Sequence, residues 1–134
     1  MNILADTHIV LWALKNDTTL PFEARNLLTD AENDIYYSVA SIWEIEIKHG
    51  IRPEQIKLNG RQSVSFCEKA GYRELPVRRE HIFLLETLQR RTDAPVHKDP
   101  FDRILIAQAK CEQMVFLTHD AMMRGYNEKC IRIV

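Results

Sequence analysis

Two aspartates follow short apolar runs that have the length of buried strands. Asp6 ends the run NILA, and Asp120 ends the run VFLTH. Ligands of open α/β sheets bind at the carboxyl ends of the strands, where the following helices begin. Carboxylates gathered at such an edge are suitable ligands for a hard divalent cation such as Mg²⁺ or Mn²⁺. Aspartate is also a common helix N-cap, so each residue taken alone has an ordinary structural explanation.

A third acid, Asp102, lies in a predicted helix over residues 101–113. A rotation of 100° per residue puts Asp102 between Ala109 and Ile106 on an apolar arc, whereas Arg103 lies on another side. A carboxylate that faces a core is costly unless it is paired, hydrogen-bonded or bound to a metal. The inward position therefore favours a functional role over a simple interaction with the helix dipole.

Two further polar residues precede this helix. Asp99 followed by Pro100 is typical of an N-cap and the first helical position. A structural role for Asp99 is the simpler interpretation, and a place for Asp99 or His97 in the site stays open.

The segment SVASIWEIEIKHG (38–50) offers two glutamates for the same site. On a helical wheel Glu44 shares an arc with Ser41 and Lys48 at the border of the apolar face, whereas Glu46 points into the middle of that face. Glu46 can therefore be the buried ligand, or it can pair with a cation from another element. Periodicity alone does not choose between the two.

The elements that must position these acids alternate along the chain. Strands are expected over residues 3–5, 35–37, 72–77, 114–118 and 131–134. Helices are expected over residues 7–15, 21–32, 38–50, 64–70, 79–91 and 101–113, with a short one after Asp120 and loops over 51–62 and 92–100. This alternation predicts an α/β fold with a central, mostly parallel sheet of four or five strands and helices on both faces.

Length and composition indicate one compact domain over residues 1–134, since the chain is 46% hydrophobic and 28% charged. The formal net charge of −1 gives no global positive field, so a nucleic-acid substrate would need local cations. The three cysteines, Cys67, Cys111 and Cys130, show no metal spacing and are expected to be buried, reduced thiols. We also expect a cytoplasmic protein, because no signal peptide or membrane span is recognisable.

Four segments carry a resemblance to a known family: LADTH (4–8), SVASIWEIEIKHG (38–50), HKDPFDRILIAQA (97–109) and FLTHD (116–120). In this order, and spread over nearly the whole chain, they resemble the PIN-domain ribonucleases. Among these, the chain resembles the VapC-type toxins of bacterial toxin–antitoxin pairs. Each segment is a weak signal alone, and the four together are specific.

The resemblance implies a three-layer α/β/α PIN-like fold and an endoribonuclease that depends on Mg²⁺ or Mn²⁺. It also implies a homodimer and a small VapB-type antitoxin that inhibits the enzyme. The family's acids fall on Asp6, on Glu44 rather than Glu46, on Asp102 and on Asp120, which would act as catalytic residues and metal ligands. The helix that begins with the third acid departs from the family pattern at Ile104-Leu105-Ile106. Small hydroxyl residues that line such sites match Thr7 and Thr118.

Phosphate contacts are expected from cations near the acids. Lys48, on the Glu44 arc, and Arg103, beside Asp102, are the first candidates, and a rim can include Lys98, Arg90 and Arg91. His8 and His119 are less favoured for substrate contact, because neighbouring residues of a strand point to opposite faces.

Two other functions share some of these features with a nuclease. A phosphoacceptor regulatory domain also clusters acids around Mg²⁺, but it would need two adjacent acids early and an aspartate ending a central strand in mid-chain. Residues 34–60 offer a glutamate inside a helix instead. The second alternative is a catalytically inactive PIN-like binding module, and the presence of all four acids argues against it.

Overall fold

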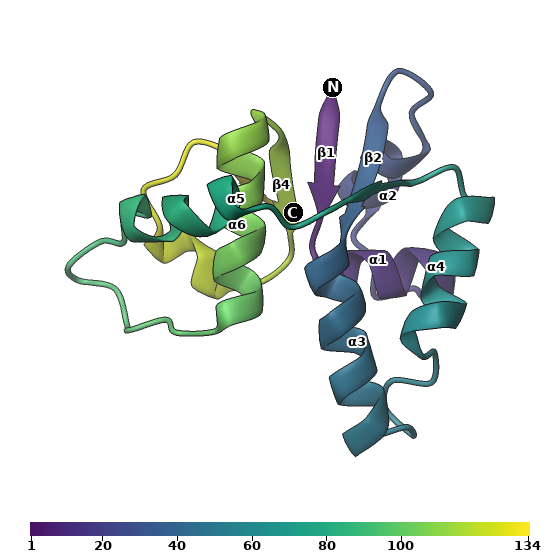
Figure 1. Ribbon diagram of the computed structural model, residues 1–134. Helices are drawn as coiled ribbons and strands as arrows, with labels where there is room; N and C mark the ends of the chain where they lie inside the picture. Colours follow the sequence, from purple (N-terminus) through teal and green to yellow (C-terminus); the bar gives the residue numbers. More distant parts are fainter.

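A five-stranded parallel sheet forms the centre of the molecule (Figure 1). The computed structural model describes residues 1–134. The strand order is β3-β2-β1-β4-β5, and every neighbouring pair is parallel. The strands are β1 (Asn2–Ala5), β2 (Asp34–Ser38), β3 (Arg73–Leu75), β4 (Val115–Thr118) and β5 (Ile131–Ile133). The predicted parallel α/β sheet is confirmed, with five strands.

Helices cover both faces of this sheet (Figure 1). The α-helices are α1 (Thr7–Leu14), α2 (Phe22–Thr29), α3 (Val39–Ile51), α4 (Gly60–Lys69), α5 (Arg79–Phe83) and α6 (Pro100–Glu112). Two 3₁₀ helices, η1 (Leu84–Thr87) and η2 (Ala121–Gly125), follow α5 and β4. None of these helices combines the length and the apolar character that a membrane span requires.

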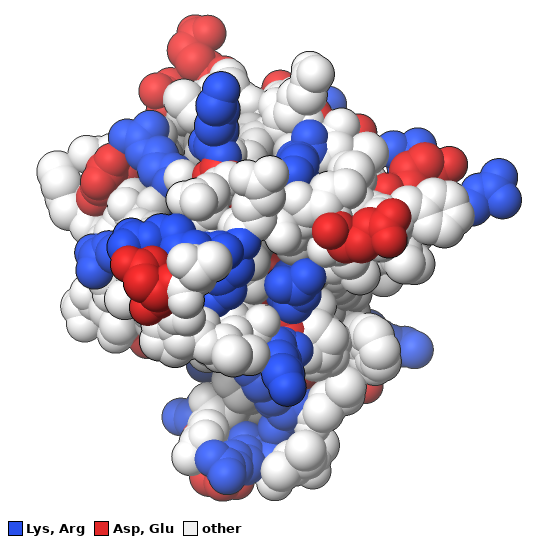
Figure 2. All heavy atoms as spheres, turned by 90° about the vertical axis from the view of Figure 1, so that its left-hand side faces the viewer, with Lys and Arg blue, Asp and Glu red and all other residues white.

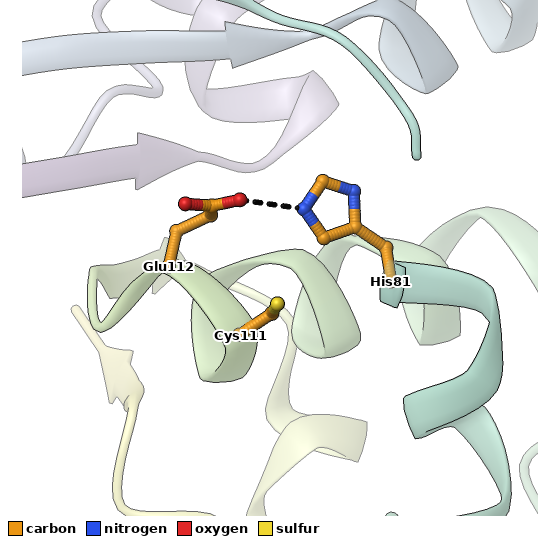
Figure 3. A group of neighbouring side chains, drawn as sticks. All are labelled: His81, Cys111 and Glu112. Atoms are coloured by element: carbon orange, nitrogen blue, oxygen red, sulfur yellow. Dashed lines mark hydrogen bonds and ion pairs between the residues drawn. The ribbon is translucent and has the colours of Figure 1, made fainter. Parts of the chain in front are cut away.

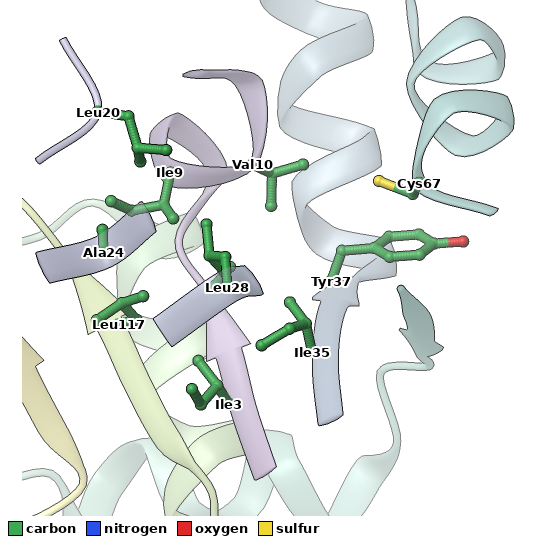
Figure 4. Packing of buried hydrophobic residues seen from close by; sticks show 11 residues of the cluster. Ile3, Ile9, Val10, Leu20, Ala24, Leu28, Ile35, Tyr37, Cys67 and Leu117 are labelled. Carbon is green, nitrogen blue, oxygen red and sulfur yellow. The ribbon is translucent and has the colours of Figure 1, made fainter. Parts of the chain in front are cut away.

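The central strand β1 contributes side chains to two separate cores. Ile3 and Ala5 belong to a cluster of 11 buried residues that includes side chains of α1, α2 and α4 (Figure 4). Leu4 belongs to a second cluster, of nine buried residues, that α6 completes. Successive side chains of a strand point to opposite faces, so a strand buried on both sides is apolar throughout. Because β1 is apolar on both sides, helices pack against both faces of the sheet, and the fold has three layers.

The predicted helix over residues 79–91 was wrong in its second half. The helical part ends with α5 and η1, and residues 88–91 are not helical. Arg90 forms an isolated antiparallel bridge with Tyr126, and Arg91 N–H donates to the Gly125 carbonyl at 2.7 Å. These bonds to a distant segment replace the local helical ones.

The predicted loop over residues 51–62 is shorter than expected. The helix α3 continues through Gly50 to Ile51, and α4 already begins at Gly60 instead of residue 64. Asn59 and Gln62 form a reciprocal capping box, because each side chain accepts a hydrogen bond from the backbone N–H of the other. Such a box satisfies two N–H groups that a helix start leaves unpaired.

The close approach of α4 to α3 predicts contrasting effects of alanine at two glycines. A Cβ at Gly60 would lie 2.8 Å from Cγ of Glu46 and 2.9 Å from Cγ2 of Ile42, whereas a Cβ at Gly50 meets nothing within 4 Å. Gly60→Ala should therefore destabilise the protein by about 1–3 kcal/mol. Gly50→Ala should stabilise it by up to about 1 kcal/mol through helix propensity. Urea unfolding of both variants tests this, and equal effects would contradict it.

Candidate active site

The four predicted acids line one pocket at the carboxyl edge of the sheet. Asp6 follows β1 and Asp120 follows β4, which are neighbouring central strands, while Glu44 comes from α3 and Asp102 from the first turn of α6. The pocket has a volume of about 370 Å³. Its lining consists of Asp6, His8, Trp12, Glu44, Lys48, Asp99, Asp102, His119 and Asp120.

Asp6 is fixed by two hydrogen bonds. Its Oδ1 accepts from the Thr7 N–H at 2.7 Å, and its Oδ2 accepts from the Thr118 hydroxyl at 2.7 Å. Only 6% of the residue is exposed, and this burial raises the pKa of Asp6 even though both hydrogen bonds act to lower it. The Thr118 oxygen also accepts from the Asp120 N–H at 3.1 Å, so one hydroxyl links the acids that follow β1 and β4.

Glu44 is fixed in a similar way. The Thr7 hydroxyl donates to its Oε1 at 2.6 Å, and Lys48 Nζ lies 2.5 Å from its Oε2. Burial acts to lower the pKa of Lys48, but the hydrogen bond from Lys48 to Glu44 and the nearby negative charges raise it overall. Lys48 therefore stays positively charged at the rim of the pocket.

Glu46 does not join the site. Its side chain is exposed and accepts a hydrogen bond from the Gly60 N–H at 2.6 Å, where α4 begins. The helical wheel left Glu44 and Glu46 as competitors, with Glu46 on the more apolar arc. The apolar residues on that side of α3 pack against α4 and leave the Glu46 carboxylate at the α4 N-terminus, where negative charge is favourable.

Asp102 has a strongly perturbed carboxyl group. Burial raises its pKa to about 8, and the negative charges of Asp6, Asp99, Glu44 and Asp120 act in the same direction. Acids crowded in this way repel one another, and a divalent cation reverses that repulsion. The carboxylate-rich lining is the donor set that Mg²⁺ and Mn²⁺ prefer, so these residues fit such an ion.

Asp99 and Asp120 combine a capping role with a place in the pocket. Asp99 Oδ1 accepts from the backbone N–H groups of Phe101 and Asp102 at 2.9 and 3.2 Å, and Asp120 Oδ1 accepts from the Met122 N–H at 2.9 Å. The second oxygen of each carboxylate makes no hydrogen bond within the protein. Both residues can therefore cap a helix and still offer one oxygen to a ligand.

Three of the four residues predicted to contact the substrate do not line the pocket. Thr7 and Thr118 are 2% and 0% exposed, so they hydrogen-bond to the acids from the protein interior and do not face the pocket. Arg103 is not part of the lining, because its guanidinium donates to Tyr126 Oη at 3.3 Å and to the Leu85 carbonyl at 3.1 Å. Of the four residues named for substrate contact, only Lys48 reaches the pocket.

The pocket also contains three aromatic residues that the sequence did not favour as site residues, His8, Trp12 and His119. His8 and His119 were disfavoured by strand alternation, yet each lies beyond the end of its strand, His8 in α1 and His119 before η2, where alternation no longer applies. Trp12 joins them because α1 places residues four apart on one face. The i, i+4 spacing of His8 and Trp12 is the sequence feature that could have predicted that both residues face the pocket.

A hydrogen-bonded chain behind the pocket positions Asp102. His97 Nε2 lies 3.1 Å from Asp102 Oδ2, and His97 Nδ1 lies 2.6 Å from the hydroxyl of Tyr126. The Tyr126 ring is buried, and the Arg90 guanidinium stacks over it at 4.7 Å from the ring centre. His97 thus joins the carboxylate to a rigid part of the core.

Removing this support should weaken metal binding. Partners that orient ligand carboxylates typically contribute about 10- to 100-fold in affinity, so we expect His97→Ala to lose about 10-fold in Mn²⁺ affinity by calorimetry. His97→Gln keeps a hydrogen-bonding group and should lose less. An unchanged affinity in His97→Ala would show that Asp102 needs no such partner.

A separate cluster of possible metal ligands lies between α5 and α6. Ligand atoms of His81, Cys111 and Glu112 lie within 4.8 Å of one another, and Figure 3 shows the His81 ring directed at the Glu112 carboxylate. His81 Nδ1 accepts from the Arg78 N–H at 3.0 Å, so the ring proton of a neutral imidazole is on Nε2, 2.9 Å from Glu112. No lone pair on Nε2 is left for a metal. The role of this cluster is therefore to link α5 to α6 through the contact between His81 and Glu112.

Comparisons with known proteins agree with this architecture. A chain of VapBC2 from Rickettsia felis, bound in that structure to a promoter DNA fragment, matches with a TM-score of 0.68 at 15% identity, covering 99% of this chain and 98% of the other. A domain of a functionally unknown protein from Methanocaldococcus jannaschii matches with a TM-score of 0.54 at 18% identity, covering 99% and 90%. At such identities the likeness concerns the fold.

Sequence comparison carries the family assignment. No curated protein matches the chain significantly. The family model described as PIN domain matches residues 3–129, a range that contains all four predicted acids. With nearly the whole chain matched and the acids brought together at one sheet edge, this protein belongs to the PIN-domain family.

Proposed function

We propose that this PIN-domain chain is a metal-dependent endoribonuclease and the toxin of a toxin–antitoxin pair. The observation that carries the proposal is the pocket of about 370 Å³ into which five carboxylates converge, one of them with a pKa of about 8. Such a site is unfavourable until a cation occupies it, and strongly perturbed carboxyl groups in a cleft are typical of functional sites.

In this proposal Asp6, Glu44, Asp102 and Asp120 hold Mg²⁺ or Mn²⁺. The bound ion would neutralise charge on the scissile phosphate and lower the pKa of a coordinated water. Asp99, which is not among the proposed ligands, keeps one carboxylate oxygen free of protein partners in the pocket and would accept the proton of the attacking water. Lys48, which lines the pocket, would contact a phosphate oxygen.

Local cations support an RNA substrate despite the net charge of −1. Figure 2, which faces the α5 side of the molecule, shows Lys and Arg side chains gathered across the middle and lower part of this face. A hollow of about 260 Å³ between the segment after η1 and η2 is lined by Arg90, Arg91 and Arg124. Two of its lining residues, Ala121 and Met122, directly follow Asp120 in the chain, so these arginines would add positive charge for RNA phosphates beside η2.

A protein partner is supported by an apolar groove. Side chains of α3, α5 and α6 line a cavity of about 460 Å³ in which eight of nine residues are hydrophobic. Trp43 and Ile82 in this groove are 64% and 51% exposed, which is unusual for a monomer. We assign a VapB-type antitoxin and a second copy of the chain as partners, and the fold shared with the VapBC2 chain supports the antitoxin.

The decisive experiment is cleavage of a structured RNA by purified protein freed of any partner. We expect cleavage with Mg²⁺ or Mn²⁺, none after EDTA, and none of DNA with the same sequence. Light scattering coupled to size exclusion tests the homodimer in the same preparation. Cleavage that persists in EDTA would rule out the proposed metal chemistry.

A further inference from the structure

The acid pocket has an aromatic end. His8 and Trp12 of α1 have ring centres 5.8 Å apart, and the Trp12 and His119 ring centres lie 5.7 Å apart. All three rings line the same pocket as Asp6 and Asp120. The rings therefore face the space that the substrate of this site would occupy, at one side of the acids.

Trp12 is held rigidly at this position. One part of its side chain packs against the core cluster of α1, α2 and α4, and the residue stays only partly buried because the rest borders the pocket. Trp12 is also the single hydrophobic residue among the nine of the lining. A tryptophan with a purely structural role would not need to border a pocket lined otherwise by acids, a lysine and two histidines.

The polar edges of the rings have unused hydrogen-bonding capacity. His119 Nδ1 lies 2.5 Å from the carbonyl of Val134, so in a neutral ring the proton is on Nδ1 and the lone pair of Nε2 is free. The Trp12 indole N–H and both ring nitrogens of His8 make no hydrogen bond within the protein. The group thus offers flat apolar faces bordered by a free donor and a free acceptor.

We propose that His8, Trp12 and His119 form a stacking subsite for one unpaired nucleobase next to the phosphodiester held at the acids. This inference rests on the proposed function, and it specifies the substrate as RNA with an unstacked base at the cleavage point. Aromatic and histidine rings are the usual platforms for splayed-out bases, and stacking tolerates different bases because each has a π-face. A continuous duplex would keep its bases from the subsite.

Tryptophan fluorescence tests the subsite directly. The chain has two tryptophans, so Trp43→Phe leaves Trp12 as the only source of tryptophan fluorescence. With Mg²⁺ present, adenosine 5′-monophosphate, which has no phosphodiester to cleave, should quench Trp12. Ribose 5-phosphate, the matched control without a base, should not. Equal quenching by the two compounds, or none by either, would overturn the subsite.

Kinetics provide the second test. Trp12→Leu should raise KM for a single-stranded RNA by about 10-fold or more and change kcat little, whereas Trp12→Phe keeps a ring and should stay near wild type. Unchanged KM in Trp12→Leu would contradict the inference. The quenching test needs no change at Trp12, so it decides the matter even if Trp12→Leu does not fold.

The two tests separate this inference from the proposed function. If the wild-type protein cleaves no RNA with any metal, the proposed nuclease activity fails, while selective quenching by the nucleotide would still support a base-binding subsite. If the protein cleaves RNA but quenching and KM show no dependence on the base or on Trp12, the subsite fails and the nuclease stands.

Discussion

Asp102→Asn should abolish RNA cleavage and raise the thermal stability of the metal-free protein. Loss of a metal-ligating carboxylate should reduce the cleavage rate by about 100-fold or more. The same change removes a carboxyl group whose pKa is raised to about 8 by burial and by four neighbouring acids. At neutral pH, folding must either protonate this carboxyl group or bury it in its charged form, and both cost free energy. The neutral amide avoids this cost, so Asp102→Asn should stabilise the metal-free protein by about 1–2 kcal/mol.

Cleavage assays and thermal unfolding in EDTA check both halves of this result. Glu32→Gln is a suitable control, because this exposed glutamate precedes β2 and lies outside the pocket. It should leave cleavage and stability near wild type. Full cleavage by Asp102→Asn would disprove the metal site, whereas lost cleavage with lower stability would point to damage of the fold.

Mg²⁺ should reverse the pH dependence that Asp102 gives to stability. The pKa of this carboxyl group is about 8 in the folded chain, against an ordinary value of 3.8. Between these values the folded state binds more protons than the unfolded state, so metal-free stability falls as pH rises from about 4 to about 8. The raised pKa of Asp6 acts in the same direction. A metal requires deprotonated ligands, so the stabilisation by Mg²⁺ should grow over the same range.

Thermal unfolding of wild type and Asp102→Asn, each with EDTA and with Mg²⁺ at about pH 6 and about pH 8, isolates this effect. The difference between the two proteins removes contributions from histidines elsewhere in the chain. In wild type the shift caused by Mg²⁺ should be larger at the higher pH, and in Asp102→Asn it should be small at both. A shift independent of pH would show that no acid with a raised pKa binds the ion.

Local sequence was sufficient for the architecture and for part of the site. The apolar run before Asp6 predicted a buried central strand, and burial on both faces is what a parallel sheet imposes. The positions of Asp6 and Asp120 after strands placed them at one sheet edge, because parallel strands end there together. Asp102 was predicted to face inward from helical period alone, and its raised pKa agrees with that position.

Contacts between distant segments decided what the sequence left open. Glu44 and Glu46 differ by two positions on one helix, and only the packing of α4 against α3 takes Glu46 to the N–H of Gly60 and leaves Glu44 in the pocket. The chain after Leu88 leaves its predicted helix because its backbone bonds to residues 125–127. Such bonds depend on which segments meet in space, and no periodicity within one segment encodes them.

The sequence by itself predicted the acids of the candidate site, the strands that Asp6 and Asp120 follow and the family to which the chain belongs. The tertiary structure decided which acid of α3 enters the pocket, that His97 and Tyr126 support Asp102, and that Trp12 and two histidines line the same pocket as the acids. The physical reason is that residue type and helical or strand period fix a side chain's local direction. Its neighbours, and with them its pKa and its role, come from elements far away in the chain.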